Sequence, residues 1–339
     1  MPTSEELDIL QIILEVLAFF LILVTALPFF ANKHWSFRIW DFPRTQIFVL
    51  SVIVLLLNNI LIPLGNREVV LTTLMVVVVV IQGASILPYT PFYFKQSKKA
   101  KKNENYESIK VMFANVLQPN KQYGKLVKKI KKLDPDFLLL VETDKKWQDG
   151  LIELFSMYEY NCSVPQDNTY GMLVFSKLRL NETKVRYLVD ENIPSIETVL
   201  NTPYGQELKI FCVHPEPPSP TEAENSIPRD KELLILANEV REERIPVLVF
   251  GDLNDVAWSD TTSAFQFLSG LKDPRKGRGL YSTYHAKYPF LRWSLDHIFH
   301  SWHFKIVKIK KLGYFGSDHF PMFVEFALNP KWEEIREEE

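Results

Sequence analysis

The chain has 339 residues with 47% apolar and 24% charged side chains, and this length predicts two or three structural units. Its formal net charge is -2, so the composition gives no general affinity for nucleic acid. Cys162 and Cys212 are the only cysteines, too few for a disulfide framework or a zinc cluster.

Three apolar segments fill most of the first 94 residues, at 9–30, 47–64 and 69–87. Each is about long enough to cross a bilayer and has little polar face, so we predict three transmembrane helices within residues 1–94. The first is not expected to be a cleaved signal peptide, because acidic residues and no Lys or Arg precede it. Glu15 lies within it and either has a function or, as we favour, lies near the interface or faces the helix bundle.

The distribution of Lys and Arg predicts the orientation of these helices. Three basic residues follow the first segment and five lysines follow the third, whereas the loop between the second and third contains only Arg67. We therefore expect a multi-pass membrane protein with its long C-terminal part on the cytoplasmic side and its N-terminus outside. Residues 95–107 are polar and basic, which predicts a flexible linker.

From residue 108 to 328, short apolar runs alternate with helical patterns, which predicts an α/β domain with substantial sheet. The first expected strand ends near Asn115, and further strands are expected at 137–141, 172–175, 208–213, 247–250, 294–299 and 320–326. Helices are expected at 126–133 and 229–242. Asp255 is expected to be the N-cap of a further helix. Residues 329–339 form an acidic tail that we expect to be solvated.

Eight polar residues close or border these apolar runs: Asn115, Glu142, His214, Asp252, Asn254, Asp296, Asp318 and His319. Asp and Asn are common in turns, but Glu and His are not, so turn formation alone does not explain the set. Carboxylate and carboxamide oxygens without thiolates suit a hard cation such as Mg²⁺. Two histidines add proton donors near neutral pH, and the combination suits hydrolysis of a phosphate ester.

In this order, the motifs resemble those of the endonuclease/exonuclease/phosphatase superfamily, which has the DNase I-like fold. The matching stretches are FANV, DFLLLVET, YGMLVFSK, FCVHPEP, VFGDLND, SLDHIF and GSDHFP. The resemblance implies, for residues 108–328, a four-layer sandwich of two mixed β-sheets flanked by helices, with the site in a cleft at one edge. With its membrane segments, the whole chain is similar to membrane-anchored bacterial members, which implies an inner-membrane location.

The resemblance also implies a metal site. Glu142 would bind Mg²⁺, or Mn²⁺ in its place, with Asn115 beside it and Asp318 as a further ligand. Some relatives carry an acid two residues after the first Asn, but here Leu117 stands at that place, which leaves the number of metal ions open between one and two.

The remaining roles are implied by the same resemblance. Asp252 would orient or deprotonate the attacking water, and Asn254 would hold that water or a phosphate oxygen. His319, oriented by Asp296, would bind the phosphate. His214 would stabilise the pentacovalent state or assist the leaving group, with no partner acid apparent for it, and Tyr170 would either contact the phosphate or only pack. His297 is expected to be structural.

We therefore expect a membrane-anchored, Mg²⁺-dependent phosphodiesterase or phosphatase whose partners are a phosphoester (a lipid, a nucleic acid or a small molecule) and the bilayer, without an obligatory protein partner. A nuclease is the first alternative. From Lys95 onward acidic and basic residues balance, because four of the 39 Lys and Arg and six of the 41 Asp and Glu lie before it. The basic loop at 272–278 is either a nucleic-acid patch or a solvated turn. The intact site residues argue against a second alternative, a catalytically inactive membrane scaffold.

Overall fold

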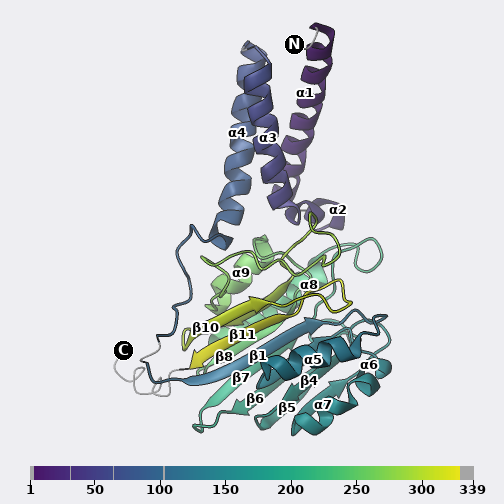
Figure 1. Cartoon of the computed structure of the whole chain (residues 1–339), viewed down its shortest axis with the longest axis vertical. Helices are drawn as coiled ribbons and strands as arrows, with labels where there is room; N and C mark the ends of the chain where they lie inside the picture. Colours follow the sequence, from purple (N-terminus) through teal and green to yellow (C-terminus); the bar gives the residue numbers. More distant parts are fainter. Residues whose placement is uncertain (1–3, 31, 64, 102–103, 329–339) are drawn as a thin grey trace.

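The computed structural model describes residues 4–30, 32–63, 65–101 and 104–328, and the expected acidic tail at 329–339 lies outside them. Figure 1 shows three long helices at one end of the molecule and stacked β-sheets at the other. The long helices are α1 (Ser4–Ala26), α3 (Arg44–Leu61) and α4 (Asn66–Ile86). Each contains a span long and apolar enough to cross a membrane, which confirms the three expected helices.

The long helices contact one another along narrow apolar stripes. In α1, Leu14, Ala18 and Leu21 are buried at the spacing of one helix face, whereas Val16 and Phe19 on the opposite face are exposed. Such an exposed apolar face is what a helix in lipid presents. Glu15 forms an ion pair with Arg67 in the first turn of α4. This start of α4 lies at the end of the long helices far from the sheets (Figure 1).

The loop after α1 forms a buried ionic junction next to the sheets. It contains the short helices η1 (Leu27–Phe29), α2 (Trp35–Arg38) and η2 (Ile39–Asp41). Asp41 is buried between two guanidinium groups, with Arg38 at 3.1 Å and Arg44 at 2.7 Å. Its carbonyl accepts a hydrogen bond from Trp258 Nε1 at 2.6 Å, so this junction ties the long helices to the sheet region.

Two mixed sheets form the rest of the molecule. The six-stranded sheet has the order β10 (Phe304–Lys311), β11 (Met322–Leu328), β1 (Glu107–Asn115), β2 (Phe137–Val141), β4 (Met172–Ser176) and β3 (Tyr160–Val164). The five-stranded sheet has the order β5 (Leu180–Arg186), β6 (Ser195–Asn201), β7 (Glu207–Val213), β8 (Val247–Asp252) and β9 (Asp296–His300). The pairs β1–β2 and β7–β8 are parallel, and the other neighbours are antiparallel.

The sheets pack face to face, and helices cover their outer faces. The central core joins side chains of both sheets, for example Phe137 of β2 and Phe250 of β8, whose ring centroids are 5.6 Å apart. Helices α5 (Tyr123–Leu133), α6 (Lys145–Gly150) and α7 (Ile152–Met157) share a second core with the six-stranded sheet. Helices α8 (Ile227–Glu242) and α9 (Asp260–Ser269) share a third with the five-stranded sheet. The expected four-layer sandwich is thereby confirmed.

Residues 96–100, expected within a flexible linker, are instead held against strands of both sheets. Ser97 Oγ lies 2.7 Å from His300 Nε2, and the backbones of Lys98 and Ala100 bond to Ile306. The lysine-rich composition did not predict this arrangement, because many of its hydrogen bonds are made by the backbone and do not depend on residue type.

The basic loop at 272–278 is neither a solvated turn nor an open cationic patch. Arg275 is buried and ion-pairs with the buried Asp273 at 2.7 Å. Arg278 donates to the carbonyls of Ser97 and Pro274, and Gly277 N donates to the carbonyl of Pro88, just after α4. The guanidinium groups are used internally, where the loop meets the end of the long helices.

Asp255 does not cap the following helix, contrary to expectation. The N-cap of α9 is Ser259, whose Oγ accepts from Thr262 N at 3.0 Å. Asp255 is buried one step further back, where it accepts from Ser259 Oγ at 2.5 Å and lies 3.3 Å from Arg229. Asp252, three residues earlier in the sequence, reaches the cleft, whereas Asp255 supports the loop behind it.

Candidate active site

The sheet topology brings the predicted residues to one edge. The ends of the parallel neighbours β1 and β2, and of β7 and β8, point the same way, whereas β4, β9 and β11 run antiparallel and begin there. This edge therefore contains residues at the C-terminal ends of β1, β2, β7 and β8. It also contains residues at the N-terminal ends of β4, β9 and β11. They are Asn115, Glu142, His214 and Asp252, and then Tyr170, Asp296 and His319.

Asn115 connects the two sheets across the cleft. Its Nδ2 donates to Glu142 Oε1 at 2.6 Å and to Asp252 Oδ2 at 3.0 Å. Its backbone carbonyl accepts from Ser317 Oγ at 2.9 Å, and the same hydroxyl accepts from His319 N at 3.0 Å. One buried amide and one buried hydroxyl thus fix the positions of the carboxylates relative to His319.

His319 lies between two buried carboxylates. Its Nδ1 is 3.0 and 3.1 Å from the oxygens of Asp296, and its Nε2 is 3.4 Å from Asp252 Oδ2. The antiparallel register of β8 and β9 pairs Asp252 with Asp296, which explains why one imidazole reaches both. All three residues are at most 4% exposed.

Charge decides the protonation of this cluster. Burial alone would lower the pKa of His319, but the carboxylates of Asp296 and Asp252 raise it to about 10. Burial alone would raise the pKa of Asp252, but His319 and His214 hold it below its ordinary value. At neutral pH, His319 is therefore an imidazolium facing an ionised Asp252. Although ligand-type atoms of Asp252, Asp296 and His319 lie within 4.8 Å of one another, a protonated imidazole has no lone pair for a metal ion.

Glu142 fits a divalent cation better. Its backbone has a φ of 60°, a strained value for a residue with a side chain. Its oxygens accept only from Asn115 Nδ2 and, at 3.4 Å, from Gln118 N, and within the described chain no Lys or Arg pairs with it. Burial raises the pKa of Glu142 to about 7, and the charge of nearby Asp318 adds to this rise. A hard cation would remove that penalty and stabilise the carboxylate form.

The other two predicted metal ligands are placed less simply. Asp318 is half-buried, and its carbonyl accepts from Ala286 N at 2.6 Å. Asn115 turns its amide nitrogen toward Glu142, while its Oδ1 accepts from Leu117 N at 3.0 Å. The Asn115 oxygen would reach a cation beside Glu142 only after the amide group rotated by half a turn. Glu142 and Asp318, in contrast, offer carboxylate oxygens as they stand.

His214 and Tyr170 lie together on the far side of Asp252. Their ring centroids are 5.3 Å apart, and the Tyr170 hydroxyl bonds to Glu222 of the loop after β7. Burial lowers the pKa of His214 to about 4, so this imidazole is neutral. Its Nδ1 is buried without a hydrogen-bond partner among the described residues, which leaves a polar atom ready for a ligand.

Asn254 shapes the turn that carries Asp252. It has a φ of 50°, its backbone N–H donates to Asp252 Oδ1 at 2.9 Å, and its Nδ2 donates to the Pro215 carbonyl at 2.9 Å. One amide hydrogen remains for a ligand. Gly251 lies inside β8, where an added Cβ would be 1.8 Å from the Val213 carbonyl oxygen. Glycine is needed there because β7 approaches closely.

Two residues that the sequence analysis did not identify also shape the site. Ser317 links Asn115 to His319, and the ring of Tyr284 lies 4.9 Å from the imidazole of His319. Ser317 stands in the GSDHFP stretch and could have been singled out with it. Tyr284 comes from a long irregular loop, and no local pattern in that loop indicated a contact with His319.

Comparison with known proteins agrees with this geometry. Residues 112–319 match the Endonuclease/Exonuclease/phosphatase family. No curated protein matches the chain. Among solved structures, humanized TDP2 of D. rerio has a TM-score of 0.53 at 16% identity and covers 65% of this chain and 98% of its own.

Two further structures cover the same part of the chain. The endonuclease/exonuclease/phosphatase from Beutenbergia cavernae DSM 12333 has a TM-score of 0.53 at 17% identity, covering 66% of this chain and 72% of its own. The human Nocturnin catalytic domain has a TM-score of 0.52 at 21% identity, covering 65% of this chain and 94% of its own. These likenesses concern the fold, whereas the family match spans more than half of the sequence and includes the site. The chain belongs to the Endonuclease/Exonuclease/phosphatase family, whose members are metal-dependent phosphoester hydrolases.

Proposed function

We propose that this protein is a membrane-anchored, Mg²⁺-dependent phosphodiesterase or phosphatase, with Mn²⁺ as an alternative ion. Residues 1–94 would anchor the chain, residues 95–107 would connect it, and residues 108–328 would form the catalytic domain. The observation that carries the proposal is the pairing of the His319 imidazolium with Asp252 and Asp296. Beside it stands Glu142, a carboxylate with no cationic partner among the described residues.

Each residue of the cleft has a distinct role in this proposal. Bound Mg²⁺ would supply positive charge to the phosphoryl oxygens, and Glu142, Asp318 and Asn115 would hold it. Asp252, kept ionised by His319, would orient the attacking water and accept its proton. His319, fixed through Nδ1 by Asp296, would donate from Nε2 to a phosphoryl oxygen.

The far side of the cleft would hold the rest of the phosphoryl group. The unpaired Nδ1 of neutral His214 and the spare amide hydrogen of Asn254 would bond to its oxygens or to the leaving group. Tyr170 would contribute only if its hydroxyl left Glu222, so we assign it a packing role against His214 with a secondary place in substrate binding.

Removal of the metal tests this function. The purified chain should hydrolyse at least one member of a panel of DNA, RNA, phosphoinositides, sphingomyelin and small phosphomonoesters in Mg²⁺. Activity should vanish in EDTA and return when Mg²⁺ or Mn²⁺ is restored, because Glu142 and Asp318 alone repel an anionic phosphate. Full activity in EDTA would refute the metal assignment.

The nuclease alternative corresponds to the DNA and RNA arms of that panel. A structure of D. rerio TDP2 is described as complexed with single strand DNA product, and it has a TM-score of 0.54 with this chain at 16% identity. Against the alternative, the basic loop at 272–278 is engaged internally, since Arg275 is buried and Arg278 bonds to backbone carbonyls. Loss of Glu142, Asp252 or His319 would have favoured the inactive scaffold, but all three are present.

The location we propose is a bacterial inner membrane with the catalytic domain in the cytoplasm. The loop after α1 and the sheets lie at the same end of the long helices, as the charge distribution requires (Figure 1). A reporter enzyme fused after Glu339 should therefore show cytoplasmic-type activity, and one fused before Met1 should not. An extracytoplasmic signal from the C-terminal fusion would place the enzyme on the other face.

A further inference from the structure

A groove of about 670 Å³ runs between the start of α3 and a loop of the catalytic domain. One wall is formed by α3, chiefly Val49, Leu50 and Ile53, and the other by residues 280–282, 289, 290 and 292 with Lys311. The three α3 side chains are exposed, and their spacing places them on one helix face within the span that can cross a membrane. The apolar wall of the groove is therefore continuous with the surface that α3 presents to lipid.

The loop at 280–292 presents apolar side chains beside α3. Phe290 is 86% exposed, and Tyr288 and Leu291 nearby are also exposed. Gln46 Nε2 at the start of α3 donates to the Phe290 carbonyl at 2.8 Å, which holds this part of the loop against the helix. Exposed aromatic and aliphatic groups next to a transmembrane helix are suited to the boundary between head groups and acyl chains.

Two cations in this groove have no anionic partner among the described residues. The charged groups of Arg292 and Lys311 lie 5.0 and 4.8 Å from the ring centroid of Phe320. Each donates to a backbone carbonyl, Arg292 to Ala286 and Lys311 to Ser282, and within the described chain neither pairs with a carboxylate. Arg292 Nε is buried and has no hydrogen-bond partner in the part of the chain that the structure describes. Burial and the charge of Arg292 lower the pKa of Lys311, so both positive charges would gain from a bound anion.

The same loop connects the groove to the catalytic edge. Phe320, which the two cations flank, directly follows His319 in the sequence. Tyr284 contacts His319, and Ala286 N donates to the carbonyl of Asp318. The loop that lines the groove therefore also contacts two of the residues proposed to bind metal and phosphate, Asp318 and His319.

We propose that the substrate is an anionic phospholipid of the surrounding bilayer, bound in this groove. Its acyl chains would lie on Val49, Leu50 and Ile53, and Arg292 and Lys311 would pair with its head group. The inference rests on the proposed hydrolase function and names its substrate class. Hydrolysis would break a head-group P–O bond, with water giving its hydroxyl to phosphorus and its proton to the oxygen that leaves.

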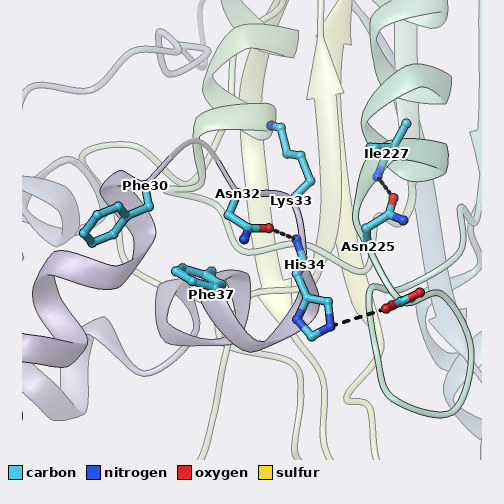
Figure 2. A pocket seen from close by; sticks show the side chains of 8 residues that line it. Phe30, Asn32, Lys33, His34, Phe37, Asn225 and Ile227 are labelled. Carbon is cyan, nitrogen blue, oxygen red and sulfur yellow. Dashed lines mark hydrogen bonds and ion pairs between the residues drawn. The ribbon is translucent and has the colours of Figure 1, made fainter.

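A second cavity at the membrane junction does not share these features. It has a volume of about 800 Å³ and is lined by Phe30, Phe37, Lys33 and His34 of the loop after α1 and by residues 224–227 (Figure 2). Lys33 is 3.1 Å from Asp230, and His34 lies 3.8 Å from Glu224. Because acids accompany its cations, this cavity has no excess positive charge to attract a lipid phosphate.

Substitution of the two cations tests the proposal. The full chain is reconstituted in phosphatidylcholine vesicles that contain phosphatidylglycerol, and bis(p-nitrophenyl) phosphate serves as the soluble ester. The double variant Arg292→Gln/Lys311→Gln should lower the ratio of lipid to soluble-ester kcat/KM by about tenfold or more, as loss of charge-assisted bonds implies. Lys310→Gln is the matched control, because Lys310 is the exposed neighbour of Lys311 on β10 and should not change the ratio.

A binding measurement separates this inference from the proposed function. Phosphatidylglycerol with a photoactivatable acyl chain should label residues 45–53 and 289–291 about tenfold more than equally labelled diacylglycerol. This preference should be lost in the double variant and kept in Lys310→Gln. Phe290→Ser, at a site too exposed to threaten folding, should reduce labelling on its own.

The possible outcomes distinguish failure of the lipid assignment from failure of the hydrolase function. Hydrolysis of the soluble ester without preferential labelling of the groove would overturn the lipid assignment and leave the hydrolase function standing. The lipid assignment would also be overturned if the double variant left the lipid-to-ester ratio unchanged. It would be overturned as well if the chain hydrolysed a nucleic acid but no lipid. Preferential labelling in a chain that hydrolyses no ester would refute the hydrolase function and leave a lipid-binding site.

Discussion

Asp252→Ala is expected to lower turnover of any substrate that the parent hydrolyses by about a hundredfold or more. The carboxylate is buried and contacts both the His319 imidazole and Asn115 Nδ2, so no neighbouring group can replace it. Loss of a general base or of an oxyanion donor has an effect of this order. His319→Ala should have a similar effect, because it removes the cation that keeps Asp252 ionised and the donor to the phosphate.

Asp296→Asn supplies the graded control for this prediction. It keeps the size of the side chain but weakens the bonds to His319 Nδ1 at 3.0 and 3.1 Å, so the loss should be smaller if Asp296 only orients the imidazole. Turnover and Tm are measured on the same purified variants. If these acids merely supported turns, stability would fall by about 1 kcal/mol with turnover nearly intact. Parent-like turnover in both alanine variants would refute the mechanism.

The sequence predicts best the elements that are buried along their whole length. Strand β2 covers residues 137–141 as expected, with all five side chains buried. Strands β7 and β8 begin within one residue of expectation for the same reason. A continuous apolar run bounded by Pro, Gly or a charged residue can hardly be anything but a central strand in an α/β domain.

Strands β5 and β6 were not predicted, because tertiary pairing rather than local pattern stabilises them. Strand β5 is largely exposed and contains Asn181, Glu182 and Lys184. Strand β6 is almost entirely buried but includes Glu197, whose charge is balanced by Arg186 at 2.7 Å and by Lys209. Such compensation comes from neighbouring strands, and a single sequence does not show which strands are neighbours.

The same limit applies within the site. Residue type and position at strand ends were enough to select Glu142, Asp252 and His319. The charges on these groups were not predictable, because the imidazolium state of His319 follows from two acids brought to it by β8 and β9. The groove cations Arg292 and Lys311 lie far apart in the sequence and come within 5.0 and 4.8 Å of the Phe320 ring centroid, so only the folded chain reveals that neither has an anionic partner among the described residues.

Arg275→Met is expected to destabilise the catalytic domain by about 3–5 kcal/mol, the usual effect of breaking a buried ion pair from one side. Arg275 is fully buried, forms a two-point pair with Asp273, and also donates to the Asp296 carbonyl and contacts His297 Nδ1. Its removal leaves the Asp273 carboxylate charged in an apolar setting and loosens the strand that carries Asp296.

A thermal melt of the detergent-solubilised chain measures this effect. The Tm should fall by roughly 10 °C, since each kcal/mol shifts the Tm of a domain of this size by about 2–4 °C. Lys276→Met is the matched control, because Lys276 is half-buried in the same loop and its ammonium group lies over the Tyr89 ring without an ion pair to any described carboxylate. Arg275→Met/Asp273→Leu should recover part of the loss by removing the stranded charge. A Tm for Arg275→Met equal to that of Lys276→Met would show that the loop is solvated after all and that its basic residues are free to bind other partners.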